Sequence, residues 1–191
     1  MSAARLEGRT DITLFLQETL SSLWCDAYLS TGAHQANLVR FRAGTFEYIC
    51  DVYSDLEAQG EVAYDQTVQD RVVAAFGVSG TTEARIARRS ARWINPNEQA
   101  AITERDHGHL IAHCIGGSGL GLNVFSQDRK LNRGYSAQGK IYRRMERYCQ
   151  ERPGTFCFSR PIYVDGSSVP RWLEFGVLRE DERLWIEVFE N

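Results

Sequence analysis

The residues best able to do chemistry are concentrated in one stretch, from Arg105 to Gly134. Its sequence, RDHGHLIAHCIGGSGLGLNVFSQDRKLNRG, holds three histidines, two asparagines and five glycines ahead of Asn123. Glycine lets the backbone approach a ligand closely, histidine transfers protons near neutral pH, and asparagine oxygen is a ligand for hard cations. Because this mixture is typical of neither a packed helix nor a plain strand, we interpret the stretch as an active site.

Hydrolysis of a phosphodiester is the reaction that these side chains fit. It requires a base that takes a proton from water, a cation that neutralises charge developing on the phosphate, and groups that hold the substrate. A histidine suits the first task. Mg²⁺ prefers oxygen ligands and keeps several waters, so one asparagine carbonyl and the phosphate oxygens can hold it. The stretch therefore predicts a metal-dependent phosphodiesterase that acts on nucleic acid.

The charge is mildly acidic overall but uneven along the chain. The formal net charge is −3, whereas proteins that bind nucleic-acid phosphates usually have a basic excess, at least locally. Such an excess is present at Arg85, Arg88, Arg89, Arg92, Arg129, Lys130, Arg133, Lys140, Arg143, Arg144 and Arg147. This asymmetry permits a basic cleft on an acidic protein. The first four arginines indicate either a solvated helical face or a strip that contacts the phosphate backbone.

Composition excludes several classes of protein. With 43% hydrophobic and 25% charged residues, the chain is typical of globular proteins, and no apolar run approaches the roughly 18 residues of a membrane span. The N-terminus has no apolar segment like that of a secretory signal. Five scattered cysteines without a CxxC pair indicate free thiols in a reducing compartment. We expect a cytoplasmic protein without membrane contact, with export by a dedicated secretion system as the alternative.

The hydrophobic pattern predicts helices in the first half of the chain and strands at its end. Helical spacing is seen in five segments, at residues 11–29, 45–59, 63–76, 81–93 and 137–150. Three segments of strand character follow, at residues 155–164, 171–179 and 183–190. We therefore predict an α+β fold, with a helical N-terminal region at residues 1–95 and a catalytic domain at residues 96–191.

The central residues carry a resemblance to a known family. Asp106-His107-Gly108-His109, the pair Gly116-Gly117, and Asn123, Gln127, Asn132 and Gly134 resemble the motif of the DNA/RNA non-specific endonucleases, which are ββα-metal (His-Me finger) nucleases. The resemblance covers about residues 100–180 and is greatest to the shorter bacterial branch, whereas residues 1–95 resemble no family that we can name. It implies a ββα-metal core with an antiparallel sheet, and non-specific cleavage that leaves a 5′-phosphate and a 3′-hydroxyl.

The resemblance also implies a role for each matching residue. His109 would be the general base, and Asn132 would be the one direct protein ligand of Mg²⁺, with Mn²⁺ or another divalent ion as a substitute. Asp106 would support them, and Asn123 would orient either His109 or the substrate. Glu146, on the helix after the metal ligand, would bind metal-coordinated water.

Four further residues are assigned to substrate binding: His107, Gln127, Arg129 and Arg133. Gln127 would also hold the loop. The family motif usually has arginine where His107 stands, and a neutral imidazole cannot anchor phosphate with two hydrogen bonds as a guanidinium does. The segment at residues 134–140 is also extended relative to the family, so Glu151 is the reserve candidate for the acidic role.

Two other interpretations remain open. His107, His109, His113 and Cys114 have residue types that zinc favours, although further ligands would have to come from elsewhere. The change at position 107 also allows a degenerate nuclease fold that binds nucleic acid or protein without cleaving it. The presence of both His109 and Asn132 argues against this second interpretation.

A non-specific nuclease without a secretory signal endangers its own cell. We therefore hypothesise that residues 1–95 control the enzyme by docking a partner, by self-association or by covering the cleft. The protein would then be a defence effector, or a toxin held by an immunity protein.

Overall fold

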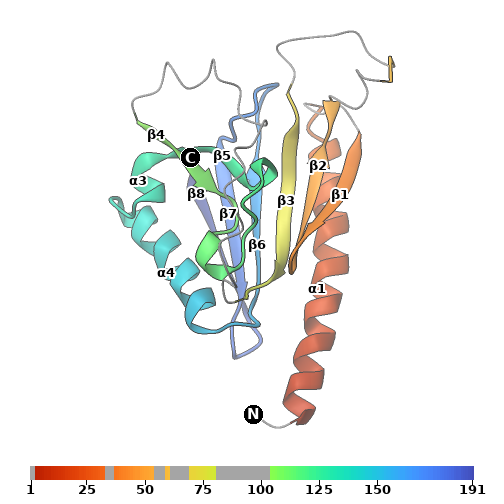
Figure 1. Cartoon of the computed structure of the whole chain (residues 1–191), viewed down its shortest axis with the longest axis vertical. Helices are drawn as coiled ribbons and strands as arrows, with labels where there is room; N and C mark the ends of the chain where they lie inside the picture. The colour runs from red at the N-terminus through yellow and green to blue at the C-terminus, as the bar shows by residue number, and fades with distance from the viewer. Residues whose placement is uncertain (1–2, 33–36, 54–58, 61–68, 81–103) are drawn as a thin grey trace.

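The core of the protein is a six-stranded antiparallel sheet with the strand order β1-β2-β3-β6-β7-β8 (Figure 1). The computed structural model describes residues 3–32, 37–53, 59–60, 69–80 and 104–191. A separate two-stranded sheet, β4-β5, stands beside it. The helices are α1 (Ala3–Leu29), α3 (Arg129–Asn132) and α4 (Ala137–Glu151), and the short 3₁₀ helices are η2 (His113–Ile115) and η3 (Gly121–Asn123). The strands are β1 (Leu38–Ala43), β2 (Phe46–Asp51), β3 (Arg71–Val78), β4 (Arg105–His109), β5 (Val124–Asp128), β6 (Phe156–Ile162), β7 (Trp172–Leu178) and β8 (Leu184–Glu190).

One face of the sheet is covered by α1. The Trp24 ring lies between Phe76 of β3 and Phe158 of β6, with ring centroids 5.6 Å and 4.7 Å away. One turn further on, the Tyr28 hydroxyl donates to the Asp51 carboxylate at 2.8 Å. The helix predicted at residues 11–29 is thus confirmed, and it begins earlier, at Ala3. No helix among the described residues is long and apolar enough to span a bilayer.

The opposite face of the sheet carries α4 and the loop that precedes β5. Tyr142 of α4 is buried against Phe175 of β7 and Phe189 of β8, with both ring centroids 5.4 Å away. Ile111 and Ile115 from the loop join the same apolar cluster. The sheet is therefore buried on both faces, in a three-layer arrangement.

Burial on both faces explains why strands stand at residues 46–51 and 71–76, where helices were predicted. Residues 54–58 and 63–68 of the two predicted helices lie outside the described residues. The segment predicted as a helix at residues 45–59 contains β2, and the segment at 63–76 ends in β3. In β3 every residue from Arg71 to Gly77 is buried, so apolar side chains do not alternate with polar ones. Such a continuous run fits helical spacing as well as strand spacing. The helix predicted at 81–93 lies outside the described residues.

The last part of the chain follows the prediction closely. Helix α4 and the three strands β6, β7 and β8 occupy the expected segments. The buried side chains of α4 are Tyr142, Met145, Glu146 and Cys149, and Ile141 and Tyr148 pack partly buried beside them.

The sheet continues across the predicted boundary at residue 95. Strand β3 pairs with β6, with Val78 opposite Phe156 and Ala75 opposite Ser159. The N-terminal region is therefore not a helical annex, since it supplies three of the six strands. That residues 1–95 control the nuclease remains a prediction.

Ser79, at the end of β3, joins the sheet to α4. Its hydroxyl accepts a hydrogen bond from the Thr155 backbone N–H at 3.1 Å and lies 3.2 Å and 3.3 Å from the carbonyl oxygens of Cys149 and Arg152. Its backbone N–H and C=O pair with Thr155 and Gly154 at 2.8 Å and 2.7 Å. One small buried side chain thus fixes the last turn of α4 to the first residues of β6.

Replacing Ser79 with alanine would leave the buried Thr155 N–H without its partner, which costs about 1–3 kcal/mol. We expect Ser79→Ala to lower the free energy of unfolding by that amount in urea titrations. Ser22→Ala, at an exposed position of α1, is the control and should change stability by less than about 0.5 kcal/mol. Equal stability of the two variants would contradict the role given to Ser79.

Candidate active site

The central stretch folds as two antiparallel strands followed by helix. Strand β4 pairs with β5, with Asp106 opposite Gln127 and His109 opposite Val124. Helix α3 begins at once, with the Asp128 carboxylate accepting a hydrogen bond from the Leu131 N–H at 2.7 Å. Helix α4 begins with Ser136, whose hydroxyl accepts from the Gly139 N–H at 2.9 Å. Both contacts satisfy backbone N–H groups that a helix start otherwise leaves open.

Alternation along β4 separates its side chains into two sets. His107 and His109 project to one side of the strand, and Asp106 and Gly108 lie on the other. His107 is exposed and His109 is partly exposed. The two histidines therefore share a face that solvent reaches.

Glycine at position 108 is required by Gln127. A Cβ atom at this position would overlap the Gln127 side chain, which is fully buried and lies near the Tyr142 hydroxyl. The assignment of Gln127 to substrate binding is wrong, because no part of its side chain reaches solvent. Its packing instead holds β5 against β4, in line with the second role expected for it.

The backbone at His109 is held from two sides. The Tyr142 hydroxyl lies 3.4 Å from the His109 carbonyl oxygen, and the next residue, Leu110, donates its N–H to the Asn123 carbonyl oxygen at 2.9 Å. Tyr142 was not among the residues predicted from the sequence. Helix α4 and the β5 side of the loop thus fix the main chain from which the imidazole projects.

Asn123 fixes the loop that follows His109. Its Oδ1 accepts from the Ile111 N–H at 2.9 Å, and its Nδ2 donates to the carbonyl oxygens of Ile111 at 2.9 Å and Ser118 at 2.7 Å. Because the side chain is completely buried, the option that Asn123 orients the substrate directly is wrong. It can position His109 only through the main chain of the loop.

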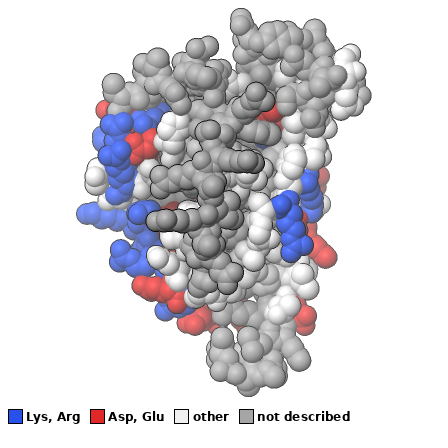
Figure 2. All heavy atoms as spheres, in the orientation of Figure 1, with Lys and Arg blue, Asp and Glu red and all other residues white. Residues whose placement is uncertain are grey.

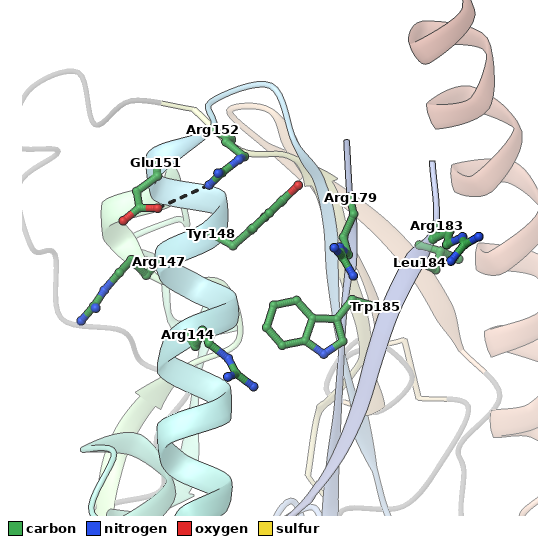
Figure 3. Close-up of a pocket in the computed structure, with 9 residues that line it drawn as sticks. All are labelled: Arg144, Arg147, Tyr148, Glu151, Arg152, Arg179, Arg183, Leu184 and Trp185. Carbon is green, nitrogen blue, oxygen red and sulfur yellow. Dashed lines mark hydrogen bonds and ion pairs between the residues drawn. The ribbon is translucent and has the colours of Figure 1, made fainter. Parts of the chain in front are cut away.

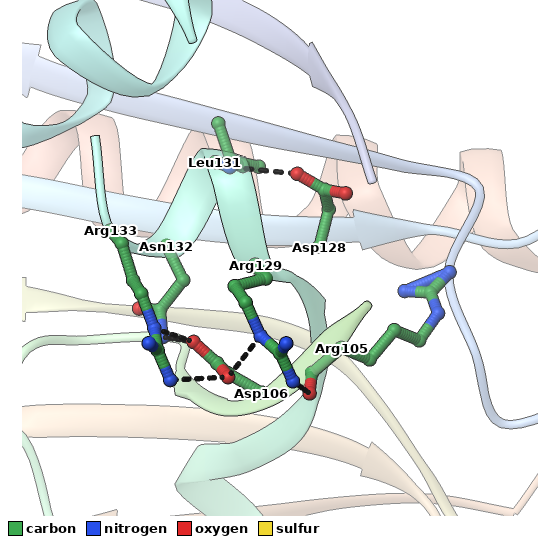
Figure 4. A network of polar contacts seen from close by, with 7 residues as sticks. All are labelled: Arg105, Asp106, Asp128, Arg129, Leu131, Asn132 and Arg133. Atoms are coloured by element: carbon green, nitrogen blue, oxygen red, sulfur yellow. Dashed lines mark hydrogen bonds and ion pairs between the residues drawn. The ribbon is translucent and has the colours of Figure 1, made fainter. Parts of the chain in front are cut away.

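Asp106 is the centre of a network that joins β4 to α3 (Figure 4). Its carboxylate oxygens accept hydrogen bonds from Arg133 at 2.6 Å and 3.0 Å, and from Arg129 at 3.1 Å. The Asn132 Nδ2 donates to the same carboxylate at 3.2 Å. Arg129 and Arg133, assigned to substrate binding, are thus ion-paired with Asp106. Their side chains remain 39% and 49% exposed, so part of each guanidinium still faces solvent.

The network fixes the orientation of the Asn132 amide. Since Nδ2 points at Asp106, Oδ1 points away from it (Figure 4). Within the described part of the chain, this oxygen accepts no hydrogen bond. An amide oxygen held in this way has the chemistry of a Mg²⁺ ligand.

The same contacts lower the pKa of Asp106 to about 2, with the hydrogen bond from Arg133 as the largest stabilising cause, followed by those from Arg129 and Asn132. A carboxyl whose pKa is lower in the folded state adds stability above its unfolded pKa and loses it as the pH falls. We expect Asp106→Asn to be less stable than wild type at neutral pH, with the difference shrinking as the pH falls from about 4 towards 2. Thermal melts across this range measure it, and a difference that is constant with pH would contradict the ion pairing.

Glu146 is the buried acid of α4. Its carboxylate pairs with Arg143 at 2.8 Å while its side chain is only 8% exposed. Burial raises its pKa, and the adjacent Arg143 opposes that effect. The reserve candidate, Glu151, is exposed and pairs with Arg152 at 3.3 Å. Of the two, Glu146 is the buried one, and a carboxyl pKa shifted by burial is typical of functional carboxylates.

A carboxyl whose pKa is raised by folding removes stability as the pH rises through that pKa. We therefore expect wild type to lose thermal stability relative to Glu146→Gln as the pH increases from about 4.5, the ordinary value for the group. Glu151→Gln, at an exposed position, should show no such trend. If the melting temperatures of wild type and Glu146→Gln run parallel from pH 4 to 7, the inferred pKa shift is wrong.

The zinc cluster considered from the sequence is not formed by these residues. The His113 Nδ1 lies 3.1 Å from the Gly117 carbonyl oxygen, so this nitrogen carries the hydrogen. Across the residues that the structure describes, no three or more His, Cys, Asp or Glu side chains gather in a way that could hold a metal. A Mg²⁺ site built on one asparagine does not need such a group.

The family model for the DNA/RNA non-specific endonucleases matches residues 56–177, which is more than half of the chain. The chain belongs to this family. The match confirms the resemblance drawn from the central motif and extends it upstream, so β3 is part of the family domain as well as of its sheet. The protein is thus a nuclease with a ββα-metal fold.

Two nucleases are among the solved structures to which the chain is similar. One is described as "Structure of Sda1 nuclease with bound zinc ion", at 15% identity and a TM-score of 0.40, covering 83% of this chain and 73% of that chain. The other is an extracellular endonuclease, at 16% identity and a TM-score of 0.43, covering 82% of this chain and 83% of that chain. A comparison with curated protein sequences gave no match.

Proposed function

We propose that this nuclease is a metal-dependent, sequence-non-specific endonuclease that hydrolyses DNA, RNA or both, with His109 as the general base and Asn132 as the protein ligand of Mg²⁺. The observation that carries the proposal is the fixed Asn132 amide, whose Nδ2 is bound by Asp106 while Oδ1 accepts no hydrogen bond from the described residues. His109 lies on the strand that also carries Asp106.

The residues present suit Mg²⁺ better than a softer metal. Asn132 offers an amide oxygen, and Asp106, the nearest carboxylate, is occupied by Arg129 and Arg133. An ion that keeps several of its waters is suited to a site with a single protein ligand. When bound, the cation would neutralise charge that develops on the phosphate.

The chain's own residues would then act on the water and the substrate. The imidazole of His109 takes the proton from the attacking water, because its ordinary pKa lies near neutral pH. Tyr142 and Asn123 hold the backbone around it. Glu146, with a raised pKa, lies on the helix that also supplies Tyr142, and we assign it to the water around the metal.

His107 is the substrate-binding residue that this arrangement favours. It is exposed and projects to the same side of β4 as His109. An imidazole at this place can donate one hydrogen bond to a phosphate oxygen, whereas the arginine usual in the family can donate two. We therefore expect this protein to bind substrate more weakly than family members that have arginine at position 107.

Cleavage assays on supercoiled plasmid and total RNA, with Mg²⁺ or with EDTA, test the proposal. We expect His109→Ala to lower the cleavage rate by roughly 10²–10⁴-fold, which is the usual contribution of a general base, and Asn132→Ala to abolish cleavage without loss of fold. His113→Ala, a nearby histidine outside the proposed machinery, is the control and should stay within a few-fold of wild type.

Three results would contradict the proposal. A folded wild type that cuts neither substrate with any divalent ion would favour the degenerate, non-cleaving module. Full activity of Asn132→Ala would remove the metal assignment, and activity retained in EDTA would remove the dependence on metal.

A further inference from the structure

An arginine-lined groove lies on the opposite side of α4 from the candidate active site. It has a volume of about 640 Å³ and is lined by Arg144, Arg147, Tyr148, Glu151, Arg152, Arg179, Arg183, Leu184 and Trp185. These residues come from the second half of α4, from the β7–β8 turn and from the start of β8 (Figure 3). Five of the nine are arginines.

The geometry of α4 separates this groove from the buried acid. Arg144 and Tyr148 each stand two positions from Glu146, which is about 200° around the helix axis. Glu146 and Tyr142 are buried, whereas Arg144 and Arg147 are exposed. The groove is therefore a second site and not an extension of the catalytic one.

Two aromatic rings in the groove are stacked with arginine. The Arg144 guanidinium lies 5.3 Å from the Trp185 ring centroid, and that of Arg152 lies 4.4 Å from the Tyr148 ring centroid. In Figure 3 the two rings stand on either side of the space between α4 and β8, while Arg147 extends outward from the rim. The Trp185 ring is also fixed at its edge, because its Nε1 donates to the Glu187 carboxylate at 2.9 Å.

The groove has a surplus of positive charge. Arg152 pairs with Glu151 and Glu180 at 3.3 Å and 3.4 Å, and Arg179 approaches Asp181 at 3.8 Å. The remaining three arginines form no ion pair within the described residues: Arg144, Arg147 and Arg183. Figure 2 shows Lys and Arg gathered along the edge of the molecule where α3 and α4 lie. The three arginines without an ion pair among the described residues favour an anionic ligand.

We propose that this groove binds a single-stranded segment of nucleic acid. Arginines supply contacts to the phosphates, while aromatic rings and guanidinium planes supply surfaces on which unpaired bases stack. An acidic peptide would use the same charges but would gain less from the two rings. The proposal rests on the proposed function for its choice of ligand, and it adds a second contact that holds the substrate away from the cut site.

Binding of a fluorescent single-stranded oligonucleotide to the full chain tests the proposal, by anisotropy in EDTA so that no cleavage occurs. We expect Arg144→Ala and Arg183→Ala each to weaken binding about threefold to tenfold. Each lost phosphate contact should also lower the slope of log affinity against log salt by about 0.7. Trp185→Leu should weaken binding of the single strand more than binding of a duplex of equal length.

Arg42→Ala is the matched control, since Arg42 is exposed on β1 at the other edge of the sheet. It should leave affinity within about twofold of wild type. Circular dichroism melts of all variants establish that they are folded. The proposal is overturned if folded groove variants bind like Arg42→Ala, or if oligoglutamate of equal charge competes better than unlabelled oligonucleotide.

His109→Ala separates this proposal from the proposed function. It should bind the oligonucleotide as wild type does while losing cleavage. If His109→Ala cuts normally but Arg183→Ala loses affinity, the catalytic assignment fails and the groove stands. If cleavage is lost in His109→Ala while the groove variants bind normally, the catalytic assignment stands and the groove proposal fails.

Discussion

The junction at Ser79 is the constraint on which the rest of the structure depends. Strand β3 ends there, α4 ends against its hydroxyl, and β6 begins beside its backbone. The next residue, Gly80, donates its N–H to the Ile115 carbonyl oxygen at 2.9 Å, so the loop after His109 is tied to the same point. The sheet, the helix and the catalytic loop therefore share one buried polar anchor.

From this anchor the candidate site is built outward by buried polar contacts. Tyr142 and Asn123 are held in the core and bind the backbone of His109 and of Ile111. At the far end of β4, Asp106 joins the hairpin to α3 and orients Asn132. His109 and Asn132 are partly exposed, while Tyr142 and Asn123, which hold the backbone at His109 and after it, are buried. Reactive side chains at the surface are thus held in place by buried residues with fixed conformations.

The central motif could be predicted from the sequence because its residue types are tied to chemistry. Asp106, Gly108, His109 and Asn132 stand at spacings that few other functions need. The strands β2 and β3 could not be predicted, because their burial depends on α1 and on the loop covering opposite faces of the sheet. Likewise, Gln127 carries a polar side chain that suggests a surface role, and only the packing against Gly108 reveals that it is interior.

The order of the strands has a consequence for how the chain folds. Strands β1, β2 and β3 follow one another in the sheet, as do β6, β7 and β8, and the β1–β2 pair closes over a short local turn. Within the sheet, the two halves meet at the pairing of β3 with β6, and the catalytic stretch lies between Val78 and Phe156 in the sequence. Closing a loop of that length costs about 4 kcal/mol of chain entropy. Because this pairing joins segments far apart in the sequence, we expect it to be a slow step of folding.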